Sequence, residues 1–316
     1  MLKPLKLAPE FKEIIWGGNK LKTEYNKVSD LKNIAESWEL TVRPDGMNKI
    51  IGGEFDGCTM AEYIEKNGFE VVSNKQLDFF PLLIKFIDAK ANLSVQVHPD
   101  DTYALAKANS LGKTEMWYVI DAEPGAQLVY GLKPASNRDT LKKAIENGTV
   151  EDELNFVSVK KGDVFFIPSG LVHAIGAGIL LAEIQQNSNI TYRVYDYNRL
   201  GNDGKPRELH VEDALNVIVN RNEDEIEKIR FSTNVKNNNS LASCEFFKVD
   251  KFSVHAPLQF STNAESFNSI LCLDGFGEIS YNGEKFPVSK GDSYFIPANL
   301  GSYSVDGNME IILSKI

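Results

Sequence analysis

A repeated segment constrains the fold of this chain more than any other feature. GDVFFIPSGLVHAIGAG at Gly162 to Gly178 recurs as GDSYFIPANLGSYSVDG at Gly291 to Gly307, at a constant offset of 129 residues. Each copy has a Gly-Asp turn, an apolar run that ends in Ile-Pro, and a second turn before another strand-like run. Turns at this spacing between short apolar runs are typical of an antiparallel β-sandwich or barrel. The sequence therefore predicts one β-rich unit that occurs twice.

Outside the repeat, further strand-like runs are interrupted by three segments with helical periodicity, at residues 101–110, 137–147 and 211–229. We predict a mainly β fold, with two jelly-roll β-barrels from a duplicated unit and a few short helices packed beside or between them. The expected division is a first barrel with the functional site over residues 1–205, a helical linker segment over 206–232 and a second barrel over 233–316.

Composition and charge narrow the class of protein. With 316 residues, of which 42% are hydrophobic, the chain has room for roughly two globular domains. A net charge of -10 argues against a nucleic-acid partner, since such proteins present a concentrated basic face. No run approaches the roughly 20 apolar residues that span a bilayer, and the three cysteines lack the CxxC spacing of a zinc or redox site. We expect a cytoplasmic protein that binds neither nucleic acid nor membrane.

Four residues are candidate ligands of one metal ion. Gln96 and His98 are two apart in the strand-like run LSVQVHP, so both side chains leave the same face of a sheet. Glu115 begins the next strand-like run, and His173 lies in the first copy of the repeat. Imidazole, carboxylate and amide oxygen suit a borderline ion such as zinc and leave a position open for substrate. Gln96 is the weakest ligand of the four, because its donor is an amide.

The second copy of the repeat serves as an internal control. At the offset of 129 residues, Ser302 replaces His173 and Asn299 replaces Gly170. The second copy thus keeps the turn and loses the ligand, which predicts one metal ion per chain. The other two histidines, His210 and His255, lie outside the pattern, and we interpret them as structural.

Several motifs together resemble a known enzyme family. Gly162, Pro168, Gly170 and His173 match most of the second sequence motif of the cupin superfamily, without its trailing asparagine. Together with WGGNKL, ESWEL, LSVQVHPDD, GKTEMWYVID and NITYRVYDYNR, they make the first two-thirds of the chain similar to class I mannose-6-phosphate isomerases of the short bacterial type. The resemblance implies a zinc-dependent interconversion of mannose 6-phosphate and fructose 6-phosphate through an enediol. It also implies one Zn²⁺ bound at Gln96, His98, Glu115 and His173.

The resemblance further implies three catalytic residues. The catalytic arginine of the family matches Arg193, whose fixed cation suits the negative charge that develops on an enediol; the alternative is a structural ion pair with Asp196. Lys113 matches a lysine that the family places in the active site, where we expect it to contact phosphate or substrate hydroxyls; the alternative is a solvated lysine of a Gly-Lys turn. Glu183 matches a proposed general base, and we expect burial to raise its pKa. Glu183 could instead orient a zinc-bound histidine.

The chain departs from the family pattern in two places. Gly112 stands where some members have a histidine, and no complete phosphate-binding loop precedes GKT at residues 112–114. We expect a small phosphosugar substrate and a monomer or homodimer. Two alternatives remain open from the sequence: another metal-dependent cupin enzyme, such as a dioxygenase or a different sugar-phosphate isomerase, and a non-catalytic sugar-binding cupin.

Overall fold

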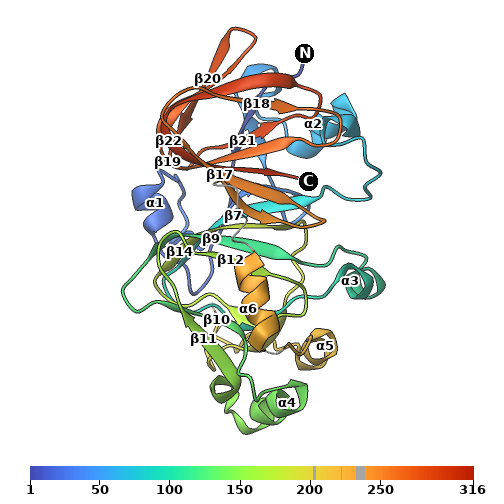
Figure 1. Cartoon of the computed structure of the whole chain (residues 1–316), viewed down its shortest axis with the longest axis vertical. Helices are drawn as coiled ribbons and strands as arrows, with labels where there is room; N and C mark the ends of the chain where they lie inside the picture. Colours follow the sequence, from blue (N-terminus) through green and yellow to red (C-terminus); the bar gives the residue numbers. More distant parts are fainter. Residues whose placement is uncertain (202–203, 222, 233–238) are drawn as a thin grey trace.

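The computed structural model describes residues 1–201, 204–221, 223–232 and 239–316. Within these residues, twenty-two strands form four sheets in which every pairing is antiparallel, and six α-helices of at most ten described residues accompany them. Figure 1 shows how these elements are arranged in space. The predicted class, mainly β with a few short helices, is confirmed.

A six-stranded sheet lies in the middle of the layered structure. Its two central strands, β14 and β7, are buried at every residue, because apolar layers cover both faces of the sheet. Strands covered on both faces are near-continuous apolar runs, as ILLAEIQQ and LLIKFIDA are. The strand order is β12 (Val164–Ile167), β9 (Glu115–Ala122), β14 (Ile179–Gln186), β7 (Leu82–Ala89), β3 (Glu36–Leu40) and β2 (Glu10–Lys12).

A five-stranded sheet covers one face of the six-stranded sheet. Leu128 and Tyr130 of this sheet pack against Trp117 and Leu181 of the six-stranded sheet. Its outer face is covered by α4 (Arg138–Asn147) and α5 (Val211–Val217). The candidate site lies between the two sheets. The strand order is β11 (Leu154–Ser158), β10 (Gln127–Leu132), β13 (His173–Ala174), β8 (Val95–Val97) and β15 (Tyr192–Tyr195).

A nine-stranded sheet covers the opposite face, where its Phe295 and Ile312 share a core with Phe86 and Ile184. Two N-terminal strands, β1 and β6, extend this sheet of otherwise C-terminal strands. The main order is β16 (Ser240–Ser243), β17 (Lys248–Val254), β22 (Gly301–Lys315), β19 (Asn268–Tyr281), β21 (Ser293–Ile296), β1 (Leu5–Ala8) and β6 (Lys49–Ile51). In addition, β18 (Leu258–Thr262) pairs with β22 and β20 (Glu284–Ser289) with β19.

The helices follow the predictions at two of three places. α3 (Asp101–Ala108) and α4 lie in the predicted segments and begin after the side-chain caps Asp100 and Asn137. The single helix predicted over 211–229 is wrong: α5 ends at Val217 and α6 begins at Glu223. The chain leaves the helix because Val219 donates its N–H to Gly170 O. The remaining elements are α1 (Lys20–Glu24), α2 (Met60–Asn67), α6 (Glu223–Ser232), β4 (Val42–Arg43), β5 (Gly46–Met47) and three 3₁₀ turns, Gly53–Phe55, Phe69–Val71 and Val150–Glu153.

The two copies of the repeat share local structure only in part. β12 and β21 occupy equivalent positions, and the following turns use residues with positive φ, Gly170 at 77° and Asn299 at 61°. Asparagine is among the few residues that adopt this left-handed conformation readily. The copies then diverge, since His173 is buried and Ser302 is exposed. Two closed barrels are not confirmed, because the hydrogen-bonded strand orders describe open sheets that pack face to face.

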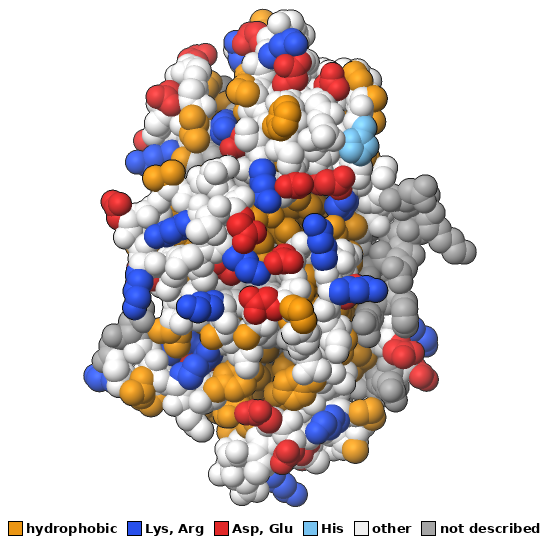
Figure 2. All heavy atoms as spheres, turned by 90° about the vertical axis from the view of Figure 1, so that its left-hand side faces the viewer, with side chains coloured by type: hydrophobic (Ala, Val, Ile, Leu, Met, Phe, Trp, Pro, Cys, Tyr) orange, Lys and Arg blue, Asp and Glu red, His pale blue; other side chains and the backbone are white. Residues whose placement is uncertain are grey.

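Charged side chains of both signs are interspersed on the face that Figure 2 shows, and no large single-sign area covers its middle. Among the described residues, no helix combines the length and apolar character needed to cross a membrane.

A buried ion pair joins β3 to the turn before β21. Lys27 Nζ lies 2.6 Å from Glu39 Oε1 and donates to Gly291 O at 2.6 Å. Ser37 also donates to Glu39 Oε1, at 2.5 Å. The Glu39 side chain is 0% exposed, so its charge depends on these neighbours.

For Lys27→Met we expect the free energy of unfolding to fall by about 3–5 kcal/mol, because the variant leaves a buried carboxylate without its cation. Lys3→Met is the matched control, since the Lys3–Glu284 pair is exposed and such pairs contribute less than about 1 kcal/mol. Chemical denaturation of both variants measures the difference. Equal losses would contradict the role given to the buried pair.

Candidate metal centre and adjoining cavity

Strands of two facing sheets bring the predicted ligands together. His98 directly follows β8 and His173 begins β13, both in the five-stranded sheet, whereas Glu115 begins β9 of the six-stranded sheet. Gln96 pairs with His173 on one side and with Arg193 on the other. Five residues from four separate segments of the sequence thus converge from both sides of the space between the sheets.

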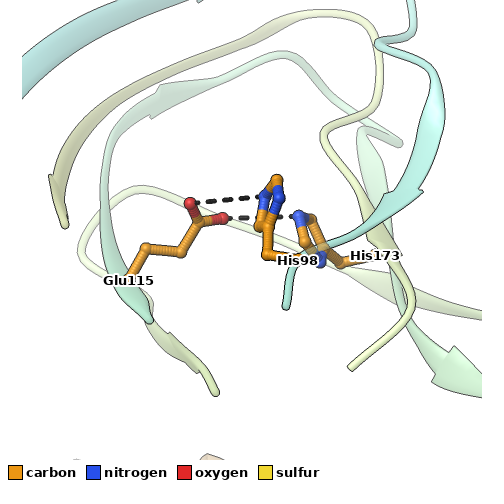
Figure 3. A group of neighbouring side chains, drawn as sticks. All are labelled: His98, Glu115 and His173. Carbon is orange, nitrogen blue, oxygen red and sulfur yellow. Dashed lines mark ion pairs between the residues drawn. The ribbon is translucent and has the colours of Figure 1, made fainter. Parts of the chain in front are cut away.

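His98, Glu115 and His173 form a compact cluster (Figure 3). Glu115 Oε1 lies 3.4 Å from His173 Nε2, and Glu115 Oε2 lies 3.7 Å from His98 Nε2. One donor atom from each of the three residues lies within 4.8 Å of the other two. All three side chains are at most 1% exposed, so the cluster is shielded from water.

Backbone carbonyls fix the orientation of both imidazoles. His98 Nδ1 lies 2.9 Å from Ile190 O, and His173 Nδ1 lies 2.8 Å from Leu171 O. A carbonyl can only accept, so each Nδ1 carries the proton and each Nε2 keeps its lone pair. Burial lowers the pKa of both histidines, that of His173 to about 4, so both rings are neutral at pH 7. Neutral imidazoles with Nε2 turned inward are in the form that binds a metal ion.

A divalent cation fits this cluster. His98 Nε2 and Glu115 Oε1 are buried atoms without a hydrogen-bond partner among the described residues, and buried polar atoms normally have one. Two donors held at about 2.1 Å by one tetrahedral zinc ion lie roughly 3.4 Å apart, close to the separations of Glu115 from the two rings. Two imidazoles and a carboxylate suit zinc and other first-row divalent ions.

Gln96 lies beside the cluster with its amide turned the other way. Its Nε2 is 3.4 Å from His173 Nε2, and Ser94 Oγ donates to its Oε1 at 3.4 Å. Metal binding through Gln96 requires the oxygen, which a 180° rotation of the amide group brings to the place of the nitrogen. The side chain is therefore in reach of the centre without completing it in this conformation.

A cavity of about 290 Å³ adjoins the cluster. Gln96, Lys113, Glu183 and Arg193 all line it. Lys113 connects the cavity to the cluster, since its Nζ lies 2.9 Å from Glu115 Oε2. The structure thus places the three predicted catalytic residues around one space beside the predicted ligands.

Close backbone packing explains why residue 112, which precedes Lys113, is a glycine. A Cβ at this position would lie 2.4–2.8 Å from backbone atoms of residues 99–101. Real Cβ atoms do not approach backbone so closely, so no side chain fits there without moving the segment. A histidine at this position is incompatible with the observed backbone.

The expected rise in the pKa of Glu183 is wrong. Burial raises its pKa, but the charges of Lys113 and Lys85 and a hydrogen bond from Trp117 outweigh burial and hold the pKa at about 2. Glu183 Oε2 lies 3.0 Å from Lys85 Nζ. The alternative that Glu183 orients a metal-bound histidine is also wrong, since carbonyl oxygens occupy both Nδ1 positions.

Arg193 does not pair with Asp196. Asp196 instead accepts from Arg199 and Arg207, and no ion pair of Arg193 occurs among the described residues. Arg193 Nε donates to Ser94 Oγ at 3.2 Å and Nη1 donates to Glu208 O at 2.7 Å. The guanidinium is therefore oriented by neutral oxygens, and its charge is available to a ligand in the cavity.

Sequence reasoning missed part of the cavity wall. Lys85, Glu36 and Arg207 line the cavity, and Trp117 contacts Glu183 from the neighbouring strand. A signal for Lys85 existed, because a lysine in the middle of the apolar run LLIKFIDA needs a buried partner. No local pattern distinguishes Glu36 or Arg207 from the many other charged residues of the chain.

Comparisons with known proteins agree with this geometry. Residues 4–123 match the family model "Phosphomannose isomerase type I, catalytic domain", and residues 237–316 match "Mannose-6-phosphate isomerase, cupin domain". Mannose-6-phosphate isomerase of Streptococcus mutans is 36% identical over 99% of this chain and 98% of its own length. The chain belongs to the type I mannose-6-phosphate isomerase family. Members of this family are aldose-ketose isomerases, so the chain is an enzyme of that class.

Two relatives from Bacillus subtilis support the assignment over the full length. Mannose-6-phosphate isomerase ManA is 36% identical over 99% of both chains. The crystal structure of mannose 6-phosphate isomerase from the same organism has 33% identity, a TM-score of 0.89 and 99% coverage of both chains. The resemblance drawn from the sequence motifs is therefore confirmed, and the isomerase interpretation prevails over a dioxygenase or a sugar-binding cupin.

For His173→Ala, after loading with zinc and dialysis, we expect the bound metal to fall at least about tenfold below that of the unchanged protein, because the cluster loses one of its two imidazoles. Ser302→Ala, at the equivalent repeat position, and His255→Ala, at an exposed histidine, are the controls. Elemental analysis of the three dialysed variants measures the effect. Equal zinc content in all three would place the metal elsewhere.

Proposed function

We propose that this enzyme is a zinc-dependent mannose-6-phosphate isomerase that interconverts mannose 6-phosphate and fructose 6-phosphate through an enediol. The observation that carries the proposal is the convergence of His98, Glu115 and His173 beside a cavity that Arg193 lines. Orphaned donor atoms at the cluster support a metal ion, and the cationic wall of the cavity supports an anionic substrate.

In the proposed mechanism the metal ion and the fixed side chains have separate roles. A zinc ion held by His98, Glu115 and His173, with Gln96 as a fourth donor, would supply Lewis-acid polarisation of the substrate oxygens at C1 and C2. Arg193 stabilises the negative charge that develops on these oxygens, and its hydrogen bonds to neutral oxygens preorganise it for this role.

Proton transfer between C1 and C2 requires a base in the cavity. Glu183 is our candidate on geometry, because its carboxylate lines the cavity, although a pKa of about 2 makes it a weaker base than proton abstraction at neutral pH favours. Lys113, fixed by Glu115, is placed to donate to a substrate hydroxyl. The 3% exposure of Glu183 keeps bulk water away from the proton in transfer.

The organisation of the chain follows from the same proposal. We assign the catalytic cupin domain to residues 1–205, a helical linker segment to 206–232 and a second cupin domain without metal ligands to 233–316. The family models for residues 4–123 and 237–316 support this division. We further propose two jelly-roll units from one duplicated ancestor, a cytoplasmic location, and a monomer or homodimer in solution.

A coupled assay tests the function. Protein stripped of metal and reconstituted with zinc is expected to convert mannose 6-phosphate to fructose 6-phosphate, and the stripped protein is expected to be inactive. Folded, zinc-loaded protein without turnover would refute the proposal. Turnover that is unchanged by stripping would refute the role of the metal.

Arg193→Ala is expected to lower kcat on the order of 10²–10³-fold while the zinc content stays at one ion per chain, because only charge stabilisation is lost. Arg193→Lys keeps the charge but not the planar fork of donors, and should recover part of the loss. Arg138→Ala, an arginine of the surface helix α4, is the control. Steady-state kinetics with elemental analysis measures both effects, and normal kcat in Arg193→Ala would remove this residue from the mechanism.

A further inference from the structure

Two carboxylates line the cavity, and they differ in how many of their oxygens already have a partner in the protein. Glu183 receives the indole N–H of Trp117 on Oε1 at 3.1 Å and faces Lys85 Nζ with Oε2 at 3.0 Å. Glu36 receives the indole N–H of Trp38 at 2.6 Å and lies 3.4 Å from Lys85 Nζ, with both contacts on Oε2. Among the described residues, no hydrogen bond reaches Glu36 Oε1. Its side chain also keeps 14% of its surface exposed, against 3% for Glu183.

The sheet fixes the position of the Glu36 carboxylate. Trp38, Lys85, Glu183 and Trp117 pair across four adjacent strands, β3, β7, β14 and β9, and so form one row along the sheet. Each carboxylate receives one indole N–H, and Lys85 lies between the two. Glu36 is thereby held in one orientation before any ligand binds, which reduces the entropy lost on binding.

The place of Glu36 in the sheet excludes two roles. β3 lies three strands from β9, which carries Glu115, and neighbouring strands are about 4.8 Å apart, so the backbone of β3 lies roughly 14 Å across the sheet from that of β9. Glu36 is also not among the residues of the donor cluster. Direct metal binding is therefore excluded. A phosphate is excluded by charge, because the Glu36 carboxylate repels an anion, and the cation Arg207 in the same cavity suits that group instead.

Sugar hydroxyls are the remaining polar groups that this carboxylate can bind. C1 and C2 react, C6 carries the phosphate, and the C5 oxygen closes the ring in the pyranose form, so the hydroxyls at C3 and C4 are the ones left for recognition in both the ring and the open-chain sugar. A carboxylate is a strong acceptor for a hydroxyl, because the hydrogen bond is charge-assisted. Trp16 and Ile14 on the same cavity wall provide apolar surface for the carbon side of a sugar.

We propose that Glu36 is a specificity-determining residue that accepts a hydrogen bond from the C3 or C4 hydroxyl of the sugar through Oε1. Trp38 and Lys85 are positioning residues for this carboxylate. The inference rests on the proposed function, since it takes a hexose 6-phosphate as the ligand of the cavity.

The test compares wild-type enzyme and Glu36→Ala on mannose 6-phosphate and on its 3-deoxy and 4-deoxy analogues. In the wild type, removal of the recognised hydroxyl should lower kcat/KM on the order of 10–100-fold, because a part-buried charged acceptor loses its donor. On mannose 6-phosphate, the kcat/KM of Glu36→Ala should fall by a similar factor, mainly because KM rises. The variant should have the same kcat/KM for mannose 6-phosphate and for the analogue that lacks the recognised hydroxyl. Glu10→Ala, at a part-exposed carboxylate on neighbouring β2, is the control and should behave as wild type.

An unchanged discrimination against both analogues in Glu36→Ala would overturn the proposal. If this variant does not fold, Glu36→Gln, which keeps the shape and weakens the acceptor, should lose part of the discrimination. An inactive wild-type protein would refute the proposed function separately. Calorimetric binding of the same three ligands then makes the same comparison without turnover.

Discussion

Two hydrogen bonds from imidazole Nδ1 to backbone carbonyls determine what the interior of this structure can do. They fix both histidine rings with Nε2 directed at Glu115 and leave those nitrogens without a proton. Without these bonds the rings could rotate or change tautomer, and the three donors would no longer face one point. The spacing of the cluster and the unpaired His98 Nε2 follow from this orientation.

The layered packing makes such a polar interior possible. The six-stranded sheet is covered on both faces, and its C-terminal partner sheet provides an apolar layer through a shared core. The opposite face can therefore carry a row of charges, in which Lys85 lies between Glu36 and Glu183. Each charge has a fixed partner, which keeps the cost of burial low enough for the fold to tolerate it. The second copy of the repeat contributes β21 to the nine-stranded sheet that packs against this layer.

Local patterns in the sequence were sufficient for the class of the fold and for the metal cluster. Short apolar runs between turns predicted the strands, the two-residue spacing of Gln96 and His98 predicted two ligands on one face, and the repeat pointed to His173. Local patterns do not predict the register between strands that are far apart in the sequence. Only strand pairing reveals that Lys85 faces Glu183, and the low pKa of Glu183 follows from that contact rather than from burial. The break between α5 and α6 likewise depends on a backbone hydrogen bond to Gly170, which lies 49 positions before Val219.

Anomalous X-ray diffraction at the zinc edge, on crystals of the zinc-loaded enzyme, is the direct test of the claim that His98, Glu115 and His173 bind the metal ion. We expect a single peak per chain, about 2.0–2.2 Å from His98 Nε2, His173 Nε2 and an oxygen of Glu115. Both Nδ1 atoms should keep their carbonyl partners. A peak at another site, or a fully active crystal batch without a peak between the two sheets, would contradict the claim.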